Sequence, residues 1–176
     1  MKAKFLVLLL AAAILAGAIT YYQQLTPRNM DVLSEDKAPS GPQQFFPDIG
    51  FTMADGSTLH LRQLKEPIVL VHFWAAWCLP CQAEFPELLK YVAKANGRIA
   101  LLAVSLDDRY TDSQKMLDKI GADIHAPHLY WAWDKGKSLS IYEFNTVKVP
   151  ETIVVKRGVM ADKIIGPAPW TDASPQ

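Results

Sequence analysis

Two cysteines separated by only two residues are the feature that most constrains how this chain can fold. Cys78 and Cys81 are the only cysteines among 176 residues. The run at 68–74 is apolar and dominated by β-branched and aromatic residues, which predicts a buried strand before them. From Leu79 to Ala95 apolar residues recur at helical spacing, so Cys78 is expected at the N-terminus of a helix.

This position predicts an activated thiol at Cys78 and a resolving thiol at Cys81. Backbone N–H groups and the positive end of the helix dipole favour thiolate over thiol at a helix N-terminus. With only two residues between them, the two sulfurs can close a small ring and cycle between dithiol and disulfide. A purely structural disulfide is disfavoured, because so short a loop restrains the unfolded chain little.

The first 22 residues have the pattern of an export segment. Two lysines precede an unbroken apolar stretch, Phe5 to Ile19, at the short end of what can span a bilayer. One interpretation is a signal peptide cleaved after the small residues at 16–18. The other, which we favour, is an uncleaved anchor helix at 1–22 with Tyr21 and Tyr22 at the membrane interface. Both predict that the remaining chain is exported.

A polar tether and one domain are expected after this segment. Residues 23–44 contain three prolines and no apolar periodicity, which indicates an extended tether. The folded domain is expected at 45–170, with a polar tail at 171–176. A formal net charge of zero and the absence of basic runs disfavour nucleic acid as a partner.

The order of elements predicts an α/β fold in which a central mixed sheet has helices on both sides. Strands are expected at 68–74, 99–106, 151–156 and 159–165, with a short strand or an extended segment at 128–133, after a hairpin at 51–59 and a helical turn at 61–65. Helices are expected at 79–95, 111–120 and 137–144. This alternation, with Cys-x-x-Cys after a strand and a hairpin at the end, indicates a thioredoxin-like fold.

Four motifs in order carry a family resemblance. They are the strand and turn at 69–81, the acidic residue and helix proline at 82–88, Val149-Pro150-Glu151-Thr152, and the strand pair around Gly158. On these motifs the domain resembles the membrane-tethered, thioredoxin-like TlpA/ResA/CcmG (DsbE) proteins of bacterial cytochrome c maturation. The resemblance implies a thiol:disulfide oxidoreductase.

The resemblance also implies roles for the matched residues. Cys78 would be the attacking thiolate and Cys81 the resolving thiol. Pro150 would be cis, pack against the disulfide and present the backbone of Val149 to an incoming peptide. The alternative for Pro150 is an ordinary turn at an edge strand. Glu84, one turn after Cys81, would control thiol protonation, or would be a solvated surface residue.

Three further side chains are candidates for supporting roles. Trp77 is expected either to shield the sulfur or to fill the core. Pro80, between the cysteines as in reducing thioredoxins, predicts a reductant rather than an oxidant. His72 lies on the expected buried strand, where thioredoxins carry aspartate and many of the resembling proteins carry asparagine. It would exchange a proton with Cys81, or be a satisfied core histidine.

Location and partners follow from the resemblance as well. It implies an anchor in the cytoplasmic (inner) membrane with the domain in the periplasm. The substrate would be an oxidised Cys-x-x-Cys-His segment of apocytochrome c, and a membrane thiol electron donor would restore the dithiol. A general reductase of other oxidised extracytoplasmic proteins is the nearest alternative. No cofactor and no metal are expected.

Three functions of other classes remain as alternatives. Cys78 and Cys81 with His125 and His128 would give a zinc or copper site of the kind a metal-binding chaperone needs, although the ligand spacing is unusual. A thioredoxin-fold peroxidase would place its cysteine in a different local sequence. A binding domain that keeps the fold without catalysis is the third.

Overall fold

The computed structural model describes residues 15–17 and 47–171. Residues 15–17 are helical and belong to a unit at 1–41 that is separate from the domain. The anchor at 1–22 and the tether at 23–44 lie almost entirely outside the described residues, so this division of the chain stays a prediction. Within the described part, no helix combines the length and hydrophobicity needed to cross a membrane.

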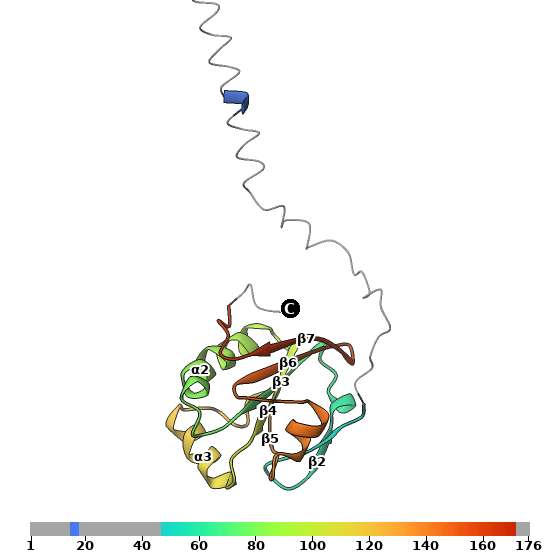
Figure 1. Cartoon of the computed structure of the whole chain (residues 1–176), viewed down its shortest axis with the longest axis vertical. Helices are drawn as coiled ribbons and strands as arrows, with labels where there is room; N and C mark the ends of the chain where they lie inside the picture. Colours follow the sequence, from blue (N-terminus) through green and yellow to red (C-terminus); the bar gives the residue numbers. More distant parts are fainter. Residues whose placement is uncertain (1–14, 18–46, 172–176) are drawn as a thin grey trace, which may run out of the picture. The chain divides into compact units, whose positions relative to one another are not determined.

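A five-stranded mixed sheet forms the centre of the domain (Figure 1). Its strands are β3 (Ile68–Trp74), β4 (Ile99–Ser105), β5 (Leu129–Trp133), β6 (Glu151–Lys156) and β7 (Val159–Ile165). They lie in the order β5-β4-β3-β6-β7, with β4 parallel to β3 and β5, and β6 antiparallel to β3 and β7. The predicted mixed sheet is confirmed, and each strand begins and ends within one residue of the prediction.

The two long helices are α2 (Leu79–Lys94) and α3 (Tyr110–Lys119), and both cover the same face of the sheet (Figure 1). The prediction of helices on both sides of the sheet is therefore borne out only through the helix predicted at 137–144, which lies against the opposite face. From β3 to β4 to β5 the chain moves across the sheet in one direction. Since parallel crossovers are right-handed, the two connecting helices must lie on one side.

Shorter elements cover the opposite face. They are the antiparallel pair β1 (Gly50–Thr52) and β2 (Thr58–His60), the 3₁₀ turn η2 (Leu61–Gln63) and the π-helical turn η3 (Leu139–Glu143). The helix predicted at 137–144 is thus only the five residues of η3, because backbone with positive φ precedes it at Lys137 and follows it at Asn145. Phe51 and Phe144 from these elements pack in the core below.

β3 is buried on both faces, and the alternation of its side chains assigns each to one of two core clusters. Leu70 and Trp74 face α2, whereas Val71 and Phe73 face the hairpin side. Strand side chains alternate with a period of two, so His72 lies on the α2 side with Leu70 and Trp74. The sheet thereby directs one polar side chain into the layer beneath α2.

Candidate active site

The two cysteines form a disulfide at the N-terminus of α2. Cys78 is the N-cap residue, and its Sγ accepts a hydrogen bond from the backbone N–H of Cys81 at 3.2 Å. Both cysteines are buried, whereas Leu79 and Pro80 are exposed. Pro80 falls in the first turn, where a helix loses nothing from a missing N–H.

Trp77 directly precedes Cys78 in the sequence, and its side chain lies on the surface. Its residue is 64% exposed, so the interpretation of Trp77 as a core-filling side chain is wrong. The expected shielding of the sulfur stays a prediction. The exposed Leu79, 74% accessible, gives the turn a second apolar side chain in contact with solvent.

A buried carboxylate that the sequence analysis missed holds the segment leading to Cys78. Both oxygens of Asp107 accept a hydrogen bond from the backbone N–H of Ala76, at 3.1 and 2.9 Å. Its Oδ2 also accepts from the hydroxyls of Ser105 and Ser113, at 3.0 and 2.8 Å. The end of β4 and the first half of α3 therefore fix the turn before the disulfide. The available signal was a charged residue directly after an apolar strand.

His72 and Glu84, which were predicted separately, come together beneath α2. Nε2 of His72 lies 3.5 Å from Oε1 of Glu84, and Nδ1 of His72 lies 2.8 Å from Oγ1 of Thr152. His72 is fully buried and Glu84 is 7% exposed, so the interpretation of Glu84 as a solvated surface residue is wrong. The interpretation of His72 as a satisfied core histidine thus holds only for Nδ1, which has Thr152 as its hydrogen-bond partner. Within the described residues, Nε2 of His72 and Oε1 of Glu84 have no hydrogen-bond partner.

Burial controls the protonation of these two groups. It lowers the pKa of His72 to about 3, so the imidazole is neutral at physiological pH. Burial also raises the pKa of Glu84, against the backbone N–H of Ala168 and the side chain of Trp170, which lower it. The carboxyl of Glu84 therefore keeps its proton to a higher pH than an exposed glutamate does.

The segment after β7 covers Glu84, and the sequence analysis missed this role of the segment. The backbone N–H of Ala168 donates to Oε2 of Glu84 at 2.9 Å. Trp170 is buried and packs against the ring of Tyr91 on α2, with 5.6 Å between ring centroids. A tryptophan in an otherwise polar, Pro-rich stretch was the available signal. This segment contributes to the burial of the carboxyl.

The Val149–Pro150 peptide bond is cis, which confirms that prediction. Pro150 is buried and precedes β6, an interior strand between β3 and β7, so the alternative of an edge-strand turn is wrong. The register pairs Glu151 with Phe73, which places Pro150 at the end of the sheet where β3 leads to Cys78. The contact of Pro150 with the disulfide stays a prediction.

A second unpredicted carboxylate ties down the loop before Pro150. Glu151 is fully buried, and its Oε1 accepts from Oγ1 of Thr146 at 2.8 Å and from Nζ of Lys163 at 3.1 Å. Lys163 also donates to the backbone carbonyls of Phe144 and Asn145, each at 3.0 Å. A glutamate that opens an apolar strand was the signal in the sequence.

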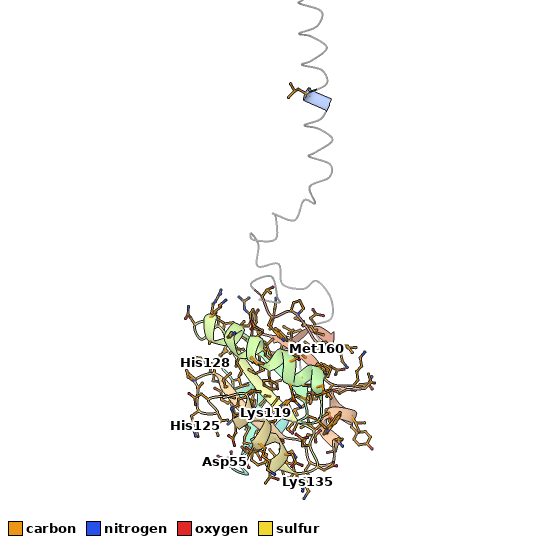
Figure 2. All side chains as sticks on the ribbon, turned by 90° about the vertical axis from the view of Figure 1, so that its left-hand side faces the viewer. Asp55, Lys119, His125, His128, Lys135 and Met160 are labelled. Carbon is orange, nitrogen blue, oxygen red and sulfur yellow. A yellow bond between two sulfur atoms is a disulfide. The ribbon has the colours of Figure 1, made fainter. Side chains whose placement is uncertain are left out.

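The four ligands of the alternative metal site are not brought together. His128 precedes β5, whose start lies at the same end of the sheet as the start of β3, whereas Cys78 follows the end of β3. Nδ1 of His128 instead contacts Oε1 of Glu66 at 2.7 Å. His125 and His128 lie near each other at one margin of the domain in Figure 2. Among the residues that the structure describes, no group of three or more His, Cys, Asp or Glu could hold a metal ion.

A Cys-x-x-Cys disulfide at the start of a helix and a cis-proline at the same end of a mixed sheet define a thioredoxin-like thiol:disulfide oxidoreductase. The AhpC/TSA family model matches residues 42–161, and the chain belongs to this family. It is 32% identical to the thiol:disulfide interchange protein HelX of Rhodobacter capsulatus, over 93% of this chain and 86% of HelX.

Two further relatives agree with this class. The thiol:disulfide interchange protein DsbE of Allochromatium vinosum is 27% identical, over 87% of this chain and 78% of DsbE. The thioredoxin domain of a thiol-disulfide oxidoreductase from Bacteroides vulgatus superposes with a TM-score of 0.58 at 26% identity, covering 70% of this chain and 88% of that domain. The resemblance found in the sequence is confirmed, and the chain is a thiol:disulfide oxidoreductase of the HelX, DsbE and ResA type.

The hydrogen bonds to Asp107 predict a stability cost. Asp107→Ala leaves the N–H of Ala76 and one of two buried hydroxyls without an acceptor, since the hydroxyls of Ser105 and Ser113 can also bond each other, so we expect a loss of about 3 kcal/mol in the free energy of unfolding. Asp112→Ala is the control, because it removes only an ion pair with the exposed Arg109 and is expected to cost under about 1 kcal/mol. Urea unfolding measures both, and equal losses would contradict the role given to Asp107.

His72 predicts a pH-dependent contribution to stability. Its pKa is lower in the folded state than in the unfolded state, so the unfolded chain binds more protons below pH 6.5 and stability falls as pH drops from there toward 3. In the oxidised protein, replacing His72 with Asn is expected to reduce the stability lost between pH 7 and 4.5 by about 2 kcal/mol. Because the pKa of Glu84 is raised, its contribution to stability changes with pH in the opposite direction. Glu84 is present in both the wild-type protein and the His72→Asn variant, so its contribution is in both measurements. Urea unfolding at the two pH values tests this, and an acid loss unchanged by the substitution would disprove it.

Proposed function

We propose that this chain is a membrane-anchored, extracytoplasmic reductant that uses Cys78 and Cys81 to reduce disulfides of apocytochrome c during cytochrome c maturation. The observation that carries the proposal is the position of Cys78 as N-cap of α2, joined to Cys81 in the same turn. The Cys78 sulfur already accepts the N–H of Cys81, and a thiolate at that place keeps this bond and strengthens it.

The chemistry is two successive exchanges. In the dithiol form, the Cys78 thiolate attacks one sulfur of the substrate disulfide, and the other substrate sulfur leaves as a thiolate. Cys81 then loses its proton and attacks the Cys78 sulfur, which releases the second substrate thiolate and forms the Cys78–Cys81 disulfide. The substrate gains two electrons and two protons. A membrane thiol donor reverses these steps on the protein and returns it to the dithiol.

The surface around the disulfide supports an extended, apolar peptide as the substrate. Trp77 and Leu79 are exposed beside the cysteines, and Val147 is exposed in the loop that leads to Pro150. The half-buried Val149 would offer its backbone to the peptide as an added strand. An unfolded apocytochrome presents its cysteines on such a flexible segment, whereas a folded protein seldom does.

The export segment supports the location. Its lysines precede the apolar stretch, and lysines flanking a span stay on the cytoplasmic side. The catalytic domain would then lie in the periplasm, held to the inner membrane by residues 1–22 and the tether at 23–44. Disulfides form and persist in that compartment, so a reductant there has substrates. The choice of apocytochrome c over other oxidised clients rests on the motif resemblance.

Trapping of a mixed disulfide tests the reaction. Cys81→Ser removes the resolving thiol, so a peptide with an oxidised Cys-x-x-Cys-His segment is expected to stay covalently bound to Cys78. Non-reducing electrophoresis and mass spectrometry measure the adduct. Cys78→Ser is the matched control and should trap much less. Absence of an adduct with Cys81→Ser, under conditions in which free thiols reduce the peptide, would contradict the proposed function.

The reduction potential tests the direction of electron flow. Pro80 between the cysteines predicts a reductant, so we expect a potential more negative than about −150 mV in equilibrium with glutathione or dithiothreitol. Pro80→His should raise the potential, because the dithiol of strongly oxidising relatives is stabilised by a histidine at this place. A wild-type potential in the range of the oxidants, near about −120 mV, would overturn the assignment as a reductant.

A further inference from the structure

We propose that His72 and Glu84 work as one proton-exchanging pair, in which His72, oriented by Thr152, holds the carboxyl of Glu84 ready to take the proton of the Cys81 thiol. This inference rests on the proposed function and adds the group that prepares the proton acceptor. Glu84 is the acceptor, and His72 is a positioning residue that acts through it.

The geometry of the pair is the first support. Nε2 of His72 and Oε1 of Glu84 are buried polar atoms that face each other at 3.5 Å, and within the described residues neither has a hydrogen-bond partner. Leaving two such atoms unpaired is unfavourable. Contacts of this kind in a resting site are often long and tighten during the reaction. The pair is therefore placed to form its bond when the protonation of Glu84 changes.

Thr152 allows the imidazole to serve both states of the carboxyl. A hydroxyl can donate or accept, so its 2.8 Å contact with Nδ1 of His72 suits either tautomer. When Glu84 is protonated, its O–H donates to Nε2 while Nδ1–H donates to Thr152. When Glu84 is ionised, Nε2–H donates to the carboxylate while Thr152 donates to Nδ1. The imidazole stays neutral throughout, as its burial requires.

The position of Glu84 on α2 links this pair to the thiol. Cys81 and Glu84 are three residues apart and both are buried, so their side chains leave the helix on the same side. In the resolving step the Cys81 S–H gives its proton to the Glu84 carboxylate. The resulting thiolate attacks the Cys78 sulfur, the Cys78–Cys81 bond forms, and the bond to the substrate breaks. The departing substrate sulfur takes the electron pair and then a proton from water, and Glu84 returns its proton to water.

Groups from each neighbouring element set the environment of the pair. Cys81 lies one turn before Glu84 on α2, with Cys78 as the N-cap, and Thr152 contacts His72 from β6. The N–H of Ala168 and the indole of Trp170 approach Glu84 from the C-terminal segment, with Tyr91 against that indole. The ring of Phe85 meets the imidazole edge-on, with centroids 5.2 Å apart, and restrains its orientation.

A double-mutant cycle on the full-length chain tests the proposal. The measurement is the rate at which Cys81 resolves a preformed mixed disulfide between Cys78 and a Cys-x-x-Cys-His peptide, followed against pH. Glu84→Gln removes the acceptor, so we expect resolution at neutral pH to slow by about 100-fold and the inflection due to the carboxyl to disappear. His72→Leu removes the N–H that stabilises the carboxylate. The inflection should then move to higher pH by about one unit, with slower resolution at neutral pH.

Two variants whose side chains differ in length distinguish a positioning role of His72 from a role in core packing alone. His72→Gln keeps an N–H donor on a long side chain and should retain most of the wild-type profile. His72→Asn keeps the donor but is too short to reach Glu84, so it should behave like His72→Leu. If the leucine variant does not fold, the asparagine and glutamine pair decides the question. In the Glu84→Gln background, changes at His72 should leave the pH profile unaltered.

Two results would overturn the inference. One is an inflection that stays in place in both His72→Asn and His72→Leu. The other is a change in the pH profile of resolution, caused by a substitution at His72, that has the same size with Glu84 and with Glu84→Gln. Such a result would show that His72 acts on the fold and not on the carboxyl. Failure of the wild-type chain to form or resolve the mixed disulfide at any pH is a different outcome, because it defeats the proposed function itself.

Discussion

Both faces of β3 are covered, by α2 on one side and by the first hairpin with η3 on the other, so all seven of its residues are removed from water. The strand ends where the turn to Cys78 begins, and His72, two residues before that end, points into the layer under α2. Burial of this strand therefore does two things for the site: it fixes the place at which α2 starts, and it keeps an imidazole neutral next to a carboxyl. A solvated β3 would give neither a rigid N-cap at Cys78 nor a shifted pKa at Glu84.

Two buried carboxylates then hold the loops on either side of this end of the sheet. Asp107 binds the N–H of Ala76 in the turn before the disulfide, and Glu151 binds Lys163 beside the cis-proline. Asp107 bonds the loop backbone directly, whereas Glu151 does so through Lys163, which donates to the carbonyls of Phe144 and Asn145. Buried charges are retained only when they are paired or hydrogen-bonded. The cysteine turn and the proline loop are thus attached to the sheet by two separate buried carboxylates. Such support is what keeps an exchange site in place through repeated oxidation and reduction.

The parts of the molecule that could be predicted are those encoded by local pattern. Local sequence pattern gave β3, β4, β6 and β7 within one residue of their bounds, left β5 open between a short strand and an extended segment, and gave the start of α2 from the helical spacing after Cys78. The side of the sheet on which the helices lie depends on strand order, which local pattern does not contain. Cys78 and Cys81 were found from their spacing after a strand, Glu84 and Pro150 from the family resemblance, and His72 from its departure from the family pattern. The partners were missed because they come from distant sequence: Thr152 is 80 residues from His72, and Ala168 is 84 residues from Glu84.

A histidine at position 72 leaves Glu84 without a second carboxyl beside it, whereas an aspartate at this position would supply one. A carboxyl facing Glu84 at this separation would make a pair of like charges when both ionise, and one of the two would then hold its proton to much higher pH. A neutral imidazole adds no second negative charge and still supplies a donor to the ionised carboxylate. Glu84 is then the only acid of this buried pair, and its pKa is set by burial, by the N–H of Ala168 and by Trp170. The choice of side chain on β3 thus determines how many protons the buried site can hold while the disulfide opens and closes.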